Sequence, residues 1–195
     1  FMKTLDQEFW SNKYKNDQAG WDLGQVSPPI KSYIDQLENK NIKILIPGAG
    51  NSYEADYLLE KGFKDITVID IASNLVEKLK SKWKNNPNIQ ILHGDFFEHD
   101  GKYDLIIEQT FFCAIDPSER ENYVRKMNEL LNQNGKLVGL LFNRHFEDGP
   151  PFGGRKEEYK KLFIEKFELV NFDTAYNSVK PRSNIELWIN CKPLH

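Results

Sequence analysis

Short apolar runs alternate with amphipathic stretches through most of the chain. The apolar runs are rich in Ile, Leu and Val and end at polar or turn-forming residues, as buried strands do. They predict strands at residues 43–48, 65–70, 89–95, 103–109 and 135–143. The stretches between them carry apolar positions at helical spacing and predict helices at residues 51–62, 72–83 and 117–131. This alternation is typical of βαβ units and of a mostly parallel, doubly wound sheet.

The C-terminal part breaks the alternation. A helix is expected at residues 155–167, followed by two strands at 167–176 and 184–192 with no helix between them. Parallel neighbours need a crossover, whereas antiparallel neighbours need only a short turn. The sequence therefore predicts an α/β fold: a Rossmann-like, doubly wound, mostly parallel seven-stranded sheet with an antiparallel C-terminal edge hairpin.

The N-terminal part, residues 2–41, is polar and interrupted by glycine and proline. It predicts an arm or lid, with a helix from Pro28 onward because proline suits a first helical turn. A length of 195 residues is typical of one domain. We therefore expect residues 2–195 to form a single domain, of which residues 2–41 are the arm.

Composition narrows the function. Apolar residues make up 39% and aromatics 13%, which argues against a disordered chain. Lys and Arg number 26 against 29 Asp and Glu, so the basic excess typical of nucleic-acid binders is absent. Cys113 and Cys191 are too few for a disulfide framework, and neither they nor the four His show metal-ligand spacing. No apolar run reaches the roughly 20 residues of a membrane helix. We expect a cytoplasmic monomer that binds no metal, nucleic acid or membrane.

Two strand ends point to a nucleoside ligand. Gly48 and Gly50 form a tight turn after the first strand, where a following helix offers free N–H groups. Asp70 ends the second strand, about 20 residues further on, where a carboxylate can accept hydrogen bonds from both ribose hydroxyls. Each feature alone also fits an ordinary strand–helix turn or a helix cap.

Tyr53 bears on which nucleoside binds. A dinucleotide fingerprint has a third glycine where this chain has Tyr53. The bulky side chain disfavours a pyrophosphate dinucleotide, whereas S-adenosylmethionine carries a ribose and a carboxylate but no phosphate. Asp95 and Phe96, after the third strand, could take the adenine amino group and stack on its ring. Gln109 ends the fourth strand, and Phe111 and Phe112 follow it either as cleft or as core.

Several longer motifs occur in one order along the chain: FWxxxY and WDLGxxSPP (9–29), LIPGAGNSYEADYL (45–58), VID (68–70), GDFF (94–97), YDLIIEQTFFCAIDPSER (103–120) and GPPFGG (149–154). With these motifs the chain resembles class I S-adenosylmethionine-dependent methyltransferases of the thiopurine methyltransferase family, including its halide and thiol methyltransferase branch. The WDxGxxxP and FFCAIDPxxR motifs are much more specific than the glycine turn.

The resemblance implies S-adenosyl-L-methionine as cofactor and a small-molecule methyl acceptor as partner. Carried over by motif, the cofactor contacts fall on Trp10, Tyr14, Trp21, Gly48, Gly50, Asp70, Ile71, Asp95, Phe96 and Gln109. The rings of the arm agree with this, since a sulfonium attracts aromatic faces. Phe112 and Phe152 are the expected acceptor contacts. No catalytic residue is assigned.

Three departures concern the acceptor. Members of the halide branch have Trp where Tyr14 stands, Tyr where Gln109 stands and GPPY where this chain has GPPF, so Phe152 lacks a hydroxyl. We expect methyl transfer to a small soft nucleophile, namely a thiol, thiopurine, selenol or halide. A thiolate or halide needs little or no general base, in keeping with the absence of an obvious His or Lys after the fourth strand.

Three other functions remain open at this point. One is a nicotinamide oxidoreductase, which Tyr53 disfavours. Another is a methyltransferase for a different or larger acceptor, such as an oxygen-bearing metabolite, which would need a base. The third is a non-catalytic module that binds an adenosyl ligand, against which the retention of both arm and pocket motifs argues only weakly.

Overall fold

A computed structural model describes residues 4–16, 20, 22–48 and 50–195 of the chain. Its centre is a seven-stranded sheet in the order β3-β2-β1-β4-β5-β7-β6. The strands are β1 (Lys43–Pro47), β2 (Asp65–Asp70), β3 (Ile89–His93), β4 (Tyr103–Gln109), β5 (Leu131–Phe142), β6 (Phe167–Thr174) and β7 (Glu186–Pro193). The first five strands pair in parallel, and β7 pairs antiparallel with both β5 and β6. The predicted fold is confirmed.

The strand order reverses at β1. From β1 the chain moves outward to β2 and β3, and then returns to place β4 on the other side of β1. The loops after β1 and β4 therefore diverge to opposite faces of the sheet and leave a crevice at their carboxyl ends. A ligand site is expected at this edge.

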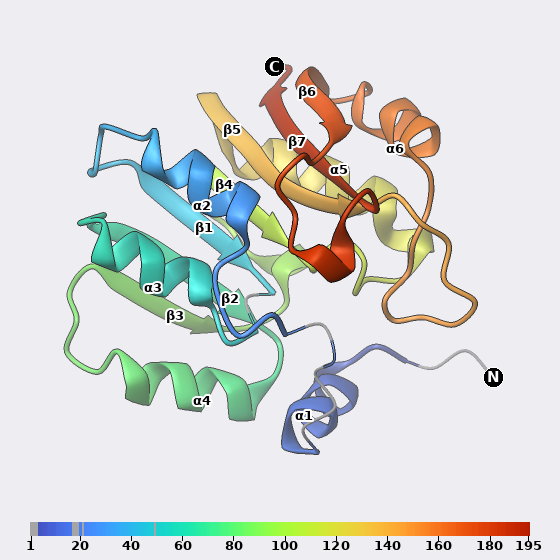
Figure 1. Ribbon diagram of the computed structural model, residues 1–195. Coiled ribbons are helices and arrows are strands. Elements are labelled where there is room, and N and C mark those ends of the chain that lie inside the picture. The colour runs from blue at the N-terminus through green and yellow to red at the C-terminus, as the bar shows by residue number, and fades with distance from the viewer. Residues whose placement is uncertain (1–3, 17–19, 21, 49) are drawn as a thin grey trace.

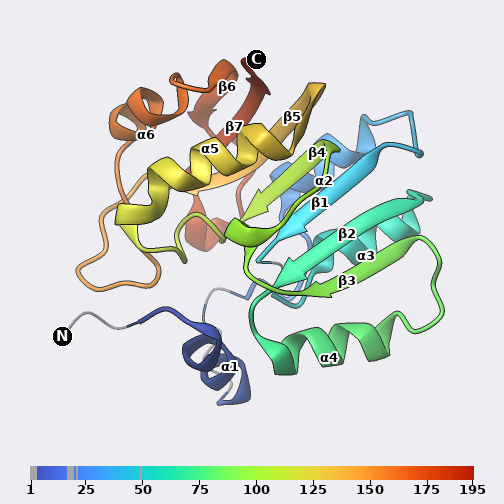
Figure 2. The ribbon, with the colours of Figure 1, turned by 180° about the vertical axis from the view of Figure 1, so that it is seen from behind.

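Helices cover both faces of the sheet (Figures 1 and 2). They are α2 (Pro28–Asp35), α3 (Tyr53–Glu60), α4 (Ser73–Lys82), α5 (Arg120–Leu130) and α6 (Lys156–Phe163), whereas α1 (Gln7–Lys15) lies beyond the carboxyl ends of the strands. One apolar cluster joins the sheet to α2, α3 and α4, and a second joins it to α5 and α6. Short 3-10 turns follow β3 (Phe96–Glu98), precede α5 (Pro117–Glu119) and precede β7 (Lys180–Arg182).

Two elements differ from the sequence prediction. Helix α1 forms within the arm because Asp6 caps it, accepting a hydrogen bond from the Phe9 N–H at 2.9 Å. Strand β5 begins at Leu131, directly after α5, four residues before the predicted start. Leu131 pairs with Tyr103, and an irregularity in register precedes the pairing of Leu105 with Lys136. Because the residues of this bulge are polar, the pattern of apolar positions does not reveal the first part of the strand.

Among the residues that the structure describes, no helix is both long and apolar enough to span a bilayer.

Candidate active site

A cavity of about 290 Å³ opens at the carboxyl ends of β1, β2, β3 and β4. Its walls are mostly apolar and aromatic, with a few acidic groups, which is usual for small-molecule sites. One end is formed by the loops after β2 and β3 and the other by the loops after β4 and β5, with α1 beside them. The crevice expected from the strand order is therefore a cavity.

Gly48 allows the backbone after β1 and the Phe111 ring to approach each other closely at the wall of the cavity. Its backbone has φ +58°, and its N–H donates to the Ile69 carbonyl at 2.8 Å. The Phe111 ring lies against its Cα face, so that a Cβ on Gly48 would come within 2.2 Å of Phe111 Cδ2. Only glycine satisfies both the positive φ and this contact. The turn after β1 and the turn after β4 therefore meet at these two residues.

Asp70 lies at the end of β2 and is 7% exposed. Its Oδ1 accepts a hydrogen bond from the Ala72 N–H at 2.9 Å. Burial raises the pKa of Asp70 from 3.8 to about 6, against backbone hydrogen bonds that lower it. Ile71, the next residue, also lines the cavity. The carboxyl group caps the following turn and lies on the wall of the cavity.

Asp95 and Phe96 follow β3 at the same end of the cavity. Asp95 is exposed, and its Oδ1 accepts the Phe97 N–H at 2.9 Å. The Phe96 ring is buried and meets the Phe111 ring edge-on, with centroids 5.0 Å apart. Phe97 is half-buried and lines the cavity too. An acid and aromatic faces therefore stand together, as the recognition of adenine requires.

A smaller recess of about 40 Å³ adjoins the cavity, and Tyr14 and Thr110 line both. Gly50 and Gln109 line the recess. Gln109 Oε1 is buried without a hydrogen-bond partner, and so is Ser52 Oγ on the same wall. Buried polar atoms are ordinarily paired, so this recess is prepared for a polar group.

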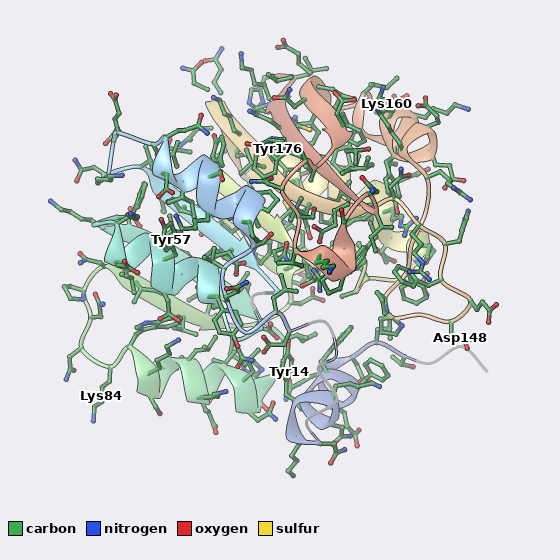
Figure 3. The ribbon with its side chains drawn as sticks, viewed as in Figure 1. Tyr14, Tyr57, Lys84, Asp148, Lys160 and Tyr176 are labelled. Carbon is green, nitrogen blue, oxygen red and sulfur yellow. The ribbon has the colours of Figure 1, made fainter. Side chains whose placement is uncertain are left out.

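Helix α1 borders both spaces. Trp10 and Tyr14 line the cavity, together with Leu5 from the residues before the helix. A Cβ on Gly50 would lie 3.3 Å from the hydroxyl of Tyr14, a residue of α1 that Figure 3 labels on the side of the helix near the strand ends. Asn74 at the start of α4 anchors the helix by donating to the Ser11 carbonyl at 3.0 Å. Trp21, the third ring of the arm, lies outside the described residues.

Glu108 holds the turn after β4, a role that the sequence analysis missed. It is fully buried and accepts hydrogen bonds from the N–H groups of Phe111 and Phe112, at 2.8 and 3.0 Å, and from the Tyr123 hydroxyl. Burial raises the pKa of Glu108 to about 7. Thr110 within this turn has φ +56°. An acidic residue inside an apolar strand was the only available signal.

Phe112 does not line the cavity, contrary to the sequence prediction. It is 1% exposed and packs edge-on against Tyr123 and Tyr159, with centroids 4.9 and 5.2 Å away. The left-handed conformation at Thr110 turns Phe111 into the cavity and Phe112 into the core. Periodicity could not reveal this, because the turn does not continue the alternation of the strand.

Phe152 also stands back from the cavity, whose wall is formed instead by Pro150 and Pro151. The Phe152 ring folds over Gly149, and its N–H donates to the Cys113 carbonyl at 2.6 Å. Arg120 reaches the same loop and donates to the Gly153 carbonyl at 2.9 Å. The loop after β5 is thereby fixed to the segment after β4.

The end of the cavity remote from Asp70 is lined by residues after β4 and β5: Phe111, Cys113, Ala114, Ile115, Asp116, Glu119, Pro150 and Pro151. Burial raises the pKa of the Cys113 thiol to about 12, so it stays protonated. Hydrogen bonds from Ser118 lower the pKa of Asp116, so it stays ionised. No lysine or histidine belongs to the lining within the described residues. This end is apolar and poor in groups able to take a proton.

The cavity fits S-adenosylmethionine. Asp70 and Asp95 offer carboxyl groups on its wall, the Gly48 turn leaves room for close approach, and Gln109 Oε1 in the adjoining recess is buried without a hydrogen-bond partner. These features belong to one continuous set of walls, joined through Tyr14 and Thr110. The remaining apolar end leaves space for a second, small molecule.

The fold is that of class I methyltransferases. The structure superposes with a TM-score of 0.77 on a 1,6-didemethyltoxoflavin N1-methyltransferase from Burkholderia thailandensis bound to S-adenosylhomocysteine, at 16% identity, covering 97% of this chain and 87% of the other. A magnesium protoporphyrin IX methyltransferase from Synechocystis, also with bound S-adenosylhomocysteine, gives a TM-score of 0.73 at 13% identity, covering 95% and 96%. At such identity these similarities concern the fold.

Sequence comparison defines the family. The family model of thiopurine S-methyltransferase matches residues 5–187. A probable thiol methyltransferase 2 of Arabidopsis thaliana is 30% identical over 184 residues, covering 91% of this chain and 81% of that protein. A thiopurine S-methyltransferase of Acinetobacter baylyi is 27% identical, covering 85% and 87%, and a thiocyanate methyltransferase 1 of Brassica oleracea is 24% identical, covering 94% and 84%.

The chain belongs to the thiopurine S-methyltransferase family. It is a methyltransferase with S-adenosylmethionine as its methyl donor and a small molecule as its substrate. The predictions of the family, the enzyme class and the cofactor are confirmed.

Proposed function

We propose that the protein transfers the methyl group of S-adenosylmethionine to a small soft nucleophile, with a thiol as the preferred acceptor. The observation that carries the acceptor class is the apolar end of the cavity, which offers no strong base. Its two acids, Asp116 and Glu119, accept hydrogen bonds from Ser118 and Asn122. An alcohol or amine acceptor would need a group to take its proton, whereas a thiol ionises close to neutral pH. The named relatives include thiol, thiopurine and thiocyanate methyltransferases.

The bound cofactor supplies an electrophilic methyl group on a positively charged sulfur. The protein's own contribution is orientation and the exclusion of water. Asp70 and Asp95 hold the nucleoside, while the rings of Trp10, Tyr14 and Phe111 offer negative faces to a cation. An anionic acceptor and a cationic donor lose charge as they react, so an apolar wall that sheds water favours the transition state. Positioning the two reactants supplies much of the remaining rate.

Burial keeps Cys113 from competing with the acceptor as a nucleophile. Cys113 belongs to the lining of the end of the cavity remote from Asp70, and its thiol would itself be a soft nucleophile if ionised. Because burial keeps its pKa near 12, almost none of it is thiolate at neutral pH. The methyl group is thereby available to an acceptor that enters already ionised.

Incubation with labelled S-adenosylmethionine and a panel of acceptors tests the proposal. The panel contains aliphatic and aromatic thiols, a thiopurine, a selenol, halides, and an alcohol and an amine of matched shape. Label transferred to thiols but not to the alcohol or amine is expected. Transfer to the alcohol or amine at comparable efficiency would contradict the proposal.

We further propose that residues 2–195 act as one domain with the arm as a lid, and that the enzyme is a cytoplasmic monomer acting without nucleic acid or membrane. The balanced charge of the sequence argues against a nucleic-acid partner, and its low cysteine content is in keeping with a reducing compartment. Light scattering of the purified protein, with and without cofactor, tests the monomer, and cell fractionation tests the compartment.

A further inference from the structure

Residues 22–27 belong to the arm, directly before α2, and form one side of the recess beside the cavity. Asp22, Leu23 and Gln25 belong to its lining, opposite Gly50 and Gln109. With the ribose assigned to Asp70 and the adenine to Asp95, the recess is the space left for the amino-acid end of the cofactor. Its orphaned polar atoms, Gln109 Oε1 and Ser52 Oγ, agree with this assignment.

The segment is attached to the beginning of α3 at both of its ends. At one end, the Asp22 carboxylate accepts hydrogen bonds from the Asn51 side-chain amide and, at 3.1 Å, from the Tyr53 hydroxyl. At the other end, the buried Glu54 carboxyl accepts the Ser27 backbone N–H. These contacts join residues 22–27 to the loop after β1 and to the first turn of α3.

Asp22 is the centre of this network. Its Oδ1 accepts the Gly24 N–H at 2.7 Å, which shapes residues 22–24 into a turn. Lys78 of α4 donates to Asn51 Oδ1 at 2.9 Å and so supports the residue that binds Asp22. Burial alone would raise the pKa of Asp22, but these hydrogen bonds and the Lys78 charge outweigh it, so that the pKa is lowered and the carboxylate stays ionised.

The network explains why tyrosine stands at position 53. In a dinucleotide fingerprint a third glycine at this place allows close packing of the helix against the strand, whereas here the Tyr53 hydroxyl reaches across to Asp22 of the arm. We propose that Asp22 and Tyr53 are positioning residues that hold residues 22–25 over the amino-acid end of the cofactor, and thereby control the release of S-adenosylhomocysteine. They act on the cofactor through the segment they hold, not through the reacting atoms.

Helix α3 offers a matched control. Tyr57, one turn after Tyr53, donates its hydroxyl to Asp35 of α2, away from the recess (Figure 3 labels Tyr57). Tyr53→Phe and Tyr57→Phe each remove one hydroxyl that joins α3 to an aspartate of residues 22–35. Only the first borders the cofactor site.

The test is the rate of S-adenosylhomocysteine dissociation, measured by stopped-flow fluorescence on the full chain. Wild-type binding is measured first, since absence of binding would refute the cofactor assignment and not this inference. A hydrogen bond to a charged group supports an acceleration of about tenfold in Tyr53→Phe and in Asp22→Ala. The double variant should release product no faster than Asp22→Ala, because the two side chains form one interaction. Tyr57→Phe should release it at the wild-type rate.

A second readout separates positioning from stability. Thermal unfolding is followed with and without S-adenosylhomocysteine, and the shift caused by the ligand is compared among the variants. The shift should shrink in Tyr53→Phe and stay at its wild-type size in Tyr57→Phe, whatever the unfolding temperature of the free proteins. If Asp22→Ala does not fold, Lys78→Met weakens the same network from α4 and should raise the release rate to a smaller extent. Equal release rates and equal shifts in Tyr53→Phe and wild type would overturn the inference.

Discussion

The Phe111 ring lies against Gly48 so closely that a Cβ at position 48 would fall 2.2 Å from Phe111 Cδ2. This contact joins the turn after β1 to the turn after β4. The strand order of the sheet reverses at β1, and the turn after β4 leads to the end of the cavity remote from Asp70. Glu108 fixes the second turn by accepting the Phe111 N–H. The turns after β1 and β4 are therefore placed relative to each other by one glycine and one ring.

Gly48→Ala should damage both stability and cofactor binding. The methyl group meets Phe111, and an alanine at φ +58° adds backbone strain of about 1–2 kcal/mol. Displacement of the ring should weaken the binding of S-adenosylhomocysteine at least tenfold, measured by calorimetry. The matched control is Gly62→Ala, where φ is +86° but no atom lies within 4 Å of the added Cβ. It should lose stability through strain alone and keep its cofactor affinity.

Phe111→Ala supplies the complementary variant. Removing the ring makes room for the methyl group, so Gly48→Ala should cost less affinity in the Phe111→Ala background than in the wild type. Strictly additive losses would mean that the contact between these residues does not control cofactor binding.

Asp70→Ala should weaken the binding of S-adenosylhomocysteine by about 1.5–3 kcal/mol, the range for losing hydrogen bonds to a charged group. The residue ends β2 on the cavity wall with one oxygen not engaged by Ala72. Calorimetry on folded Asp70→Ala and Asp70→Asn measures the loss. An unchanged dissociation constant in both variants would leave Asp70 with only its capping role.

The pH dependence of that binding has a defined sign. With a pKa of about 6 in the free protein, Asp70 must lose a proton before its carboxylate accepts ligand hydroxyls. Affinity should therefore fall as the pH drops below 6, by at most tenfold per unit, and level off above about 7. Asp70→Asn should remove the part of this dependence due to Asp70. Identical pH profiles for wild type and Asp70→Asn would contradict the assignment.

Stability should change in the opposite direction over the same range. The raised pKa means that the folded free protein holds a proton on Asp70 that the unfolded chain releases near 3.8. The contribution of this group to stability is complete below pH 3.8 and is lost as the pH rises towards 6. Denaturant titrations of wild type and Asp70→Asn should therefore diverge between these values. The comparison with Asp70→Asn is needed because Glu54 and Glu108 are also buried with raised pKa values, so their titration changes stability with pH in the same direction.

The sequence was sufficient to predict which strand ends form the site, but not how the side chains of the turns after them are oriented. Asp70 was located because an acid at the end of an apolar strand falls at a fixed place in a parallel sheet. Phe112 was wrongly expected at the cavity, and Phe111 was left open, because the left-handed Thr110 between strand and turn changes which ring faces the cavity. For Tyr53 the sequence predicted only that its bulk disfavours a dinucleotide. It did not predict the hydrogen bond to Asp22, which is 31 residues away in the sequence. Contacts between distant segments have no local pattern to reveal them.

The arm should become protected from proteolysis when cofactor is bound. Leu5, Trp10 and Tyr14 of the arm face the cavity, so a ligand adds contacts to a segment otherwise held to α4 through Asn74. Trypsin cleavage after Lys13 and Lys15 should slow with S-adenosylhomocysteine. Cleavage after the exposed Lys84, which follows α4 away from the cavity, should not change (Figure 3). Equal protection at all three sites would indicate global stabilisation and not closure of the arm.

Thiols should be methylated with greater catalytic efficiency than chloride or bromide. A small hydrated anion loses its hydration on entering the apolar end, and Ala114, Ile115 and Pro151 offer no charge to replace it. A thiolate with an apolar body offsets part of that loss by burying its carbon surface, at about 25 cal/mol per Å².

Variants at Phe152 and Phe111 test whether the preference for thiols comes from the missing hydroxyl at position 152 or from the aromatic wall at Phe111. As an acceptor contact without a hydroxyl, Phe152 would be expected to gain halide activity on change to Tyr. Because Pro150 and Pro151 form the wall in its place, Phe152→Tyr should give no such gain. Phe111→Leu should lower kcat/KM for aromatic thiols several-fold and affect small aliphatic thiols less, because an aromatic wall stacks on an aromatic acceptor. Steady-state kinetics over one matched panel measures both. If chloride or bromide outcompetes every thiol with the wild-type enzyme, the apolar wall does not select the acceptor and the preference for thiols is wrong.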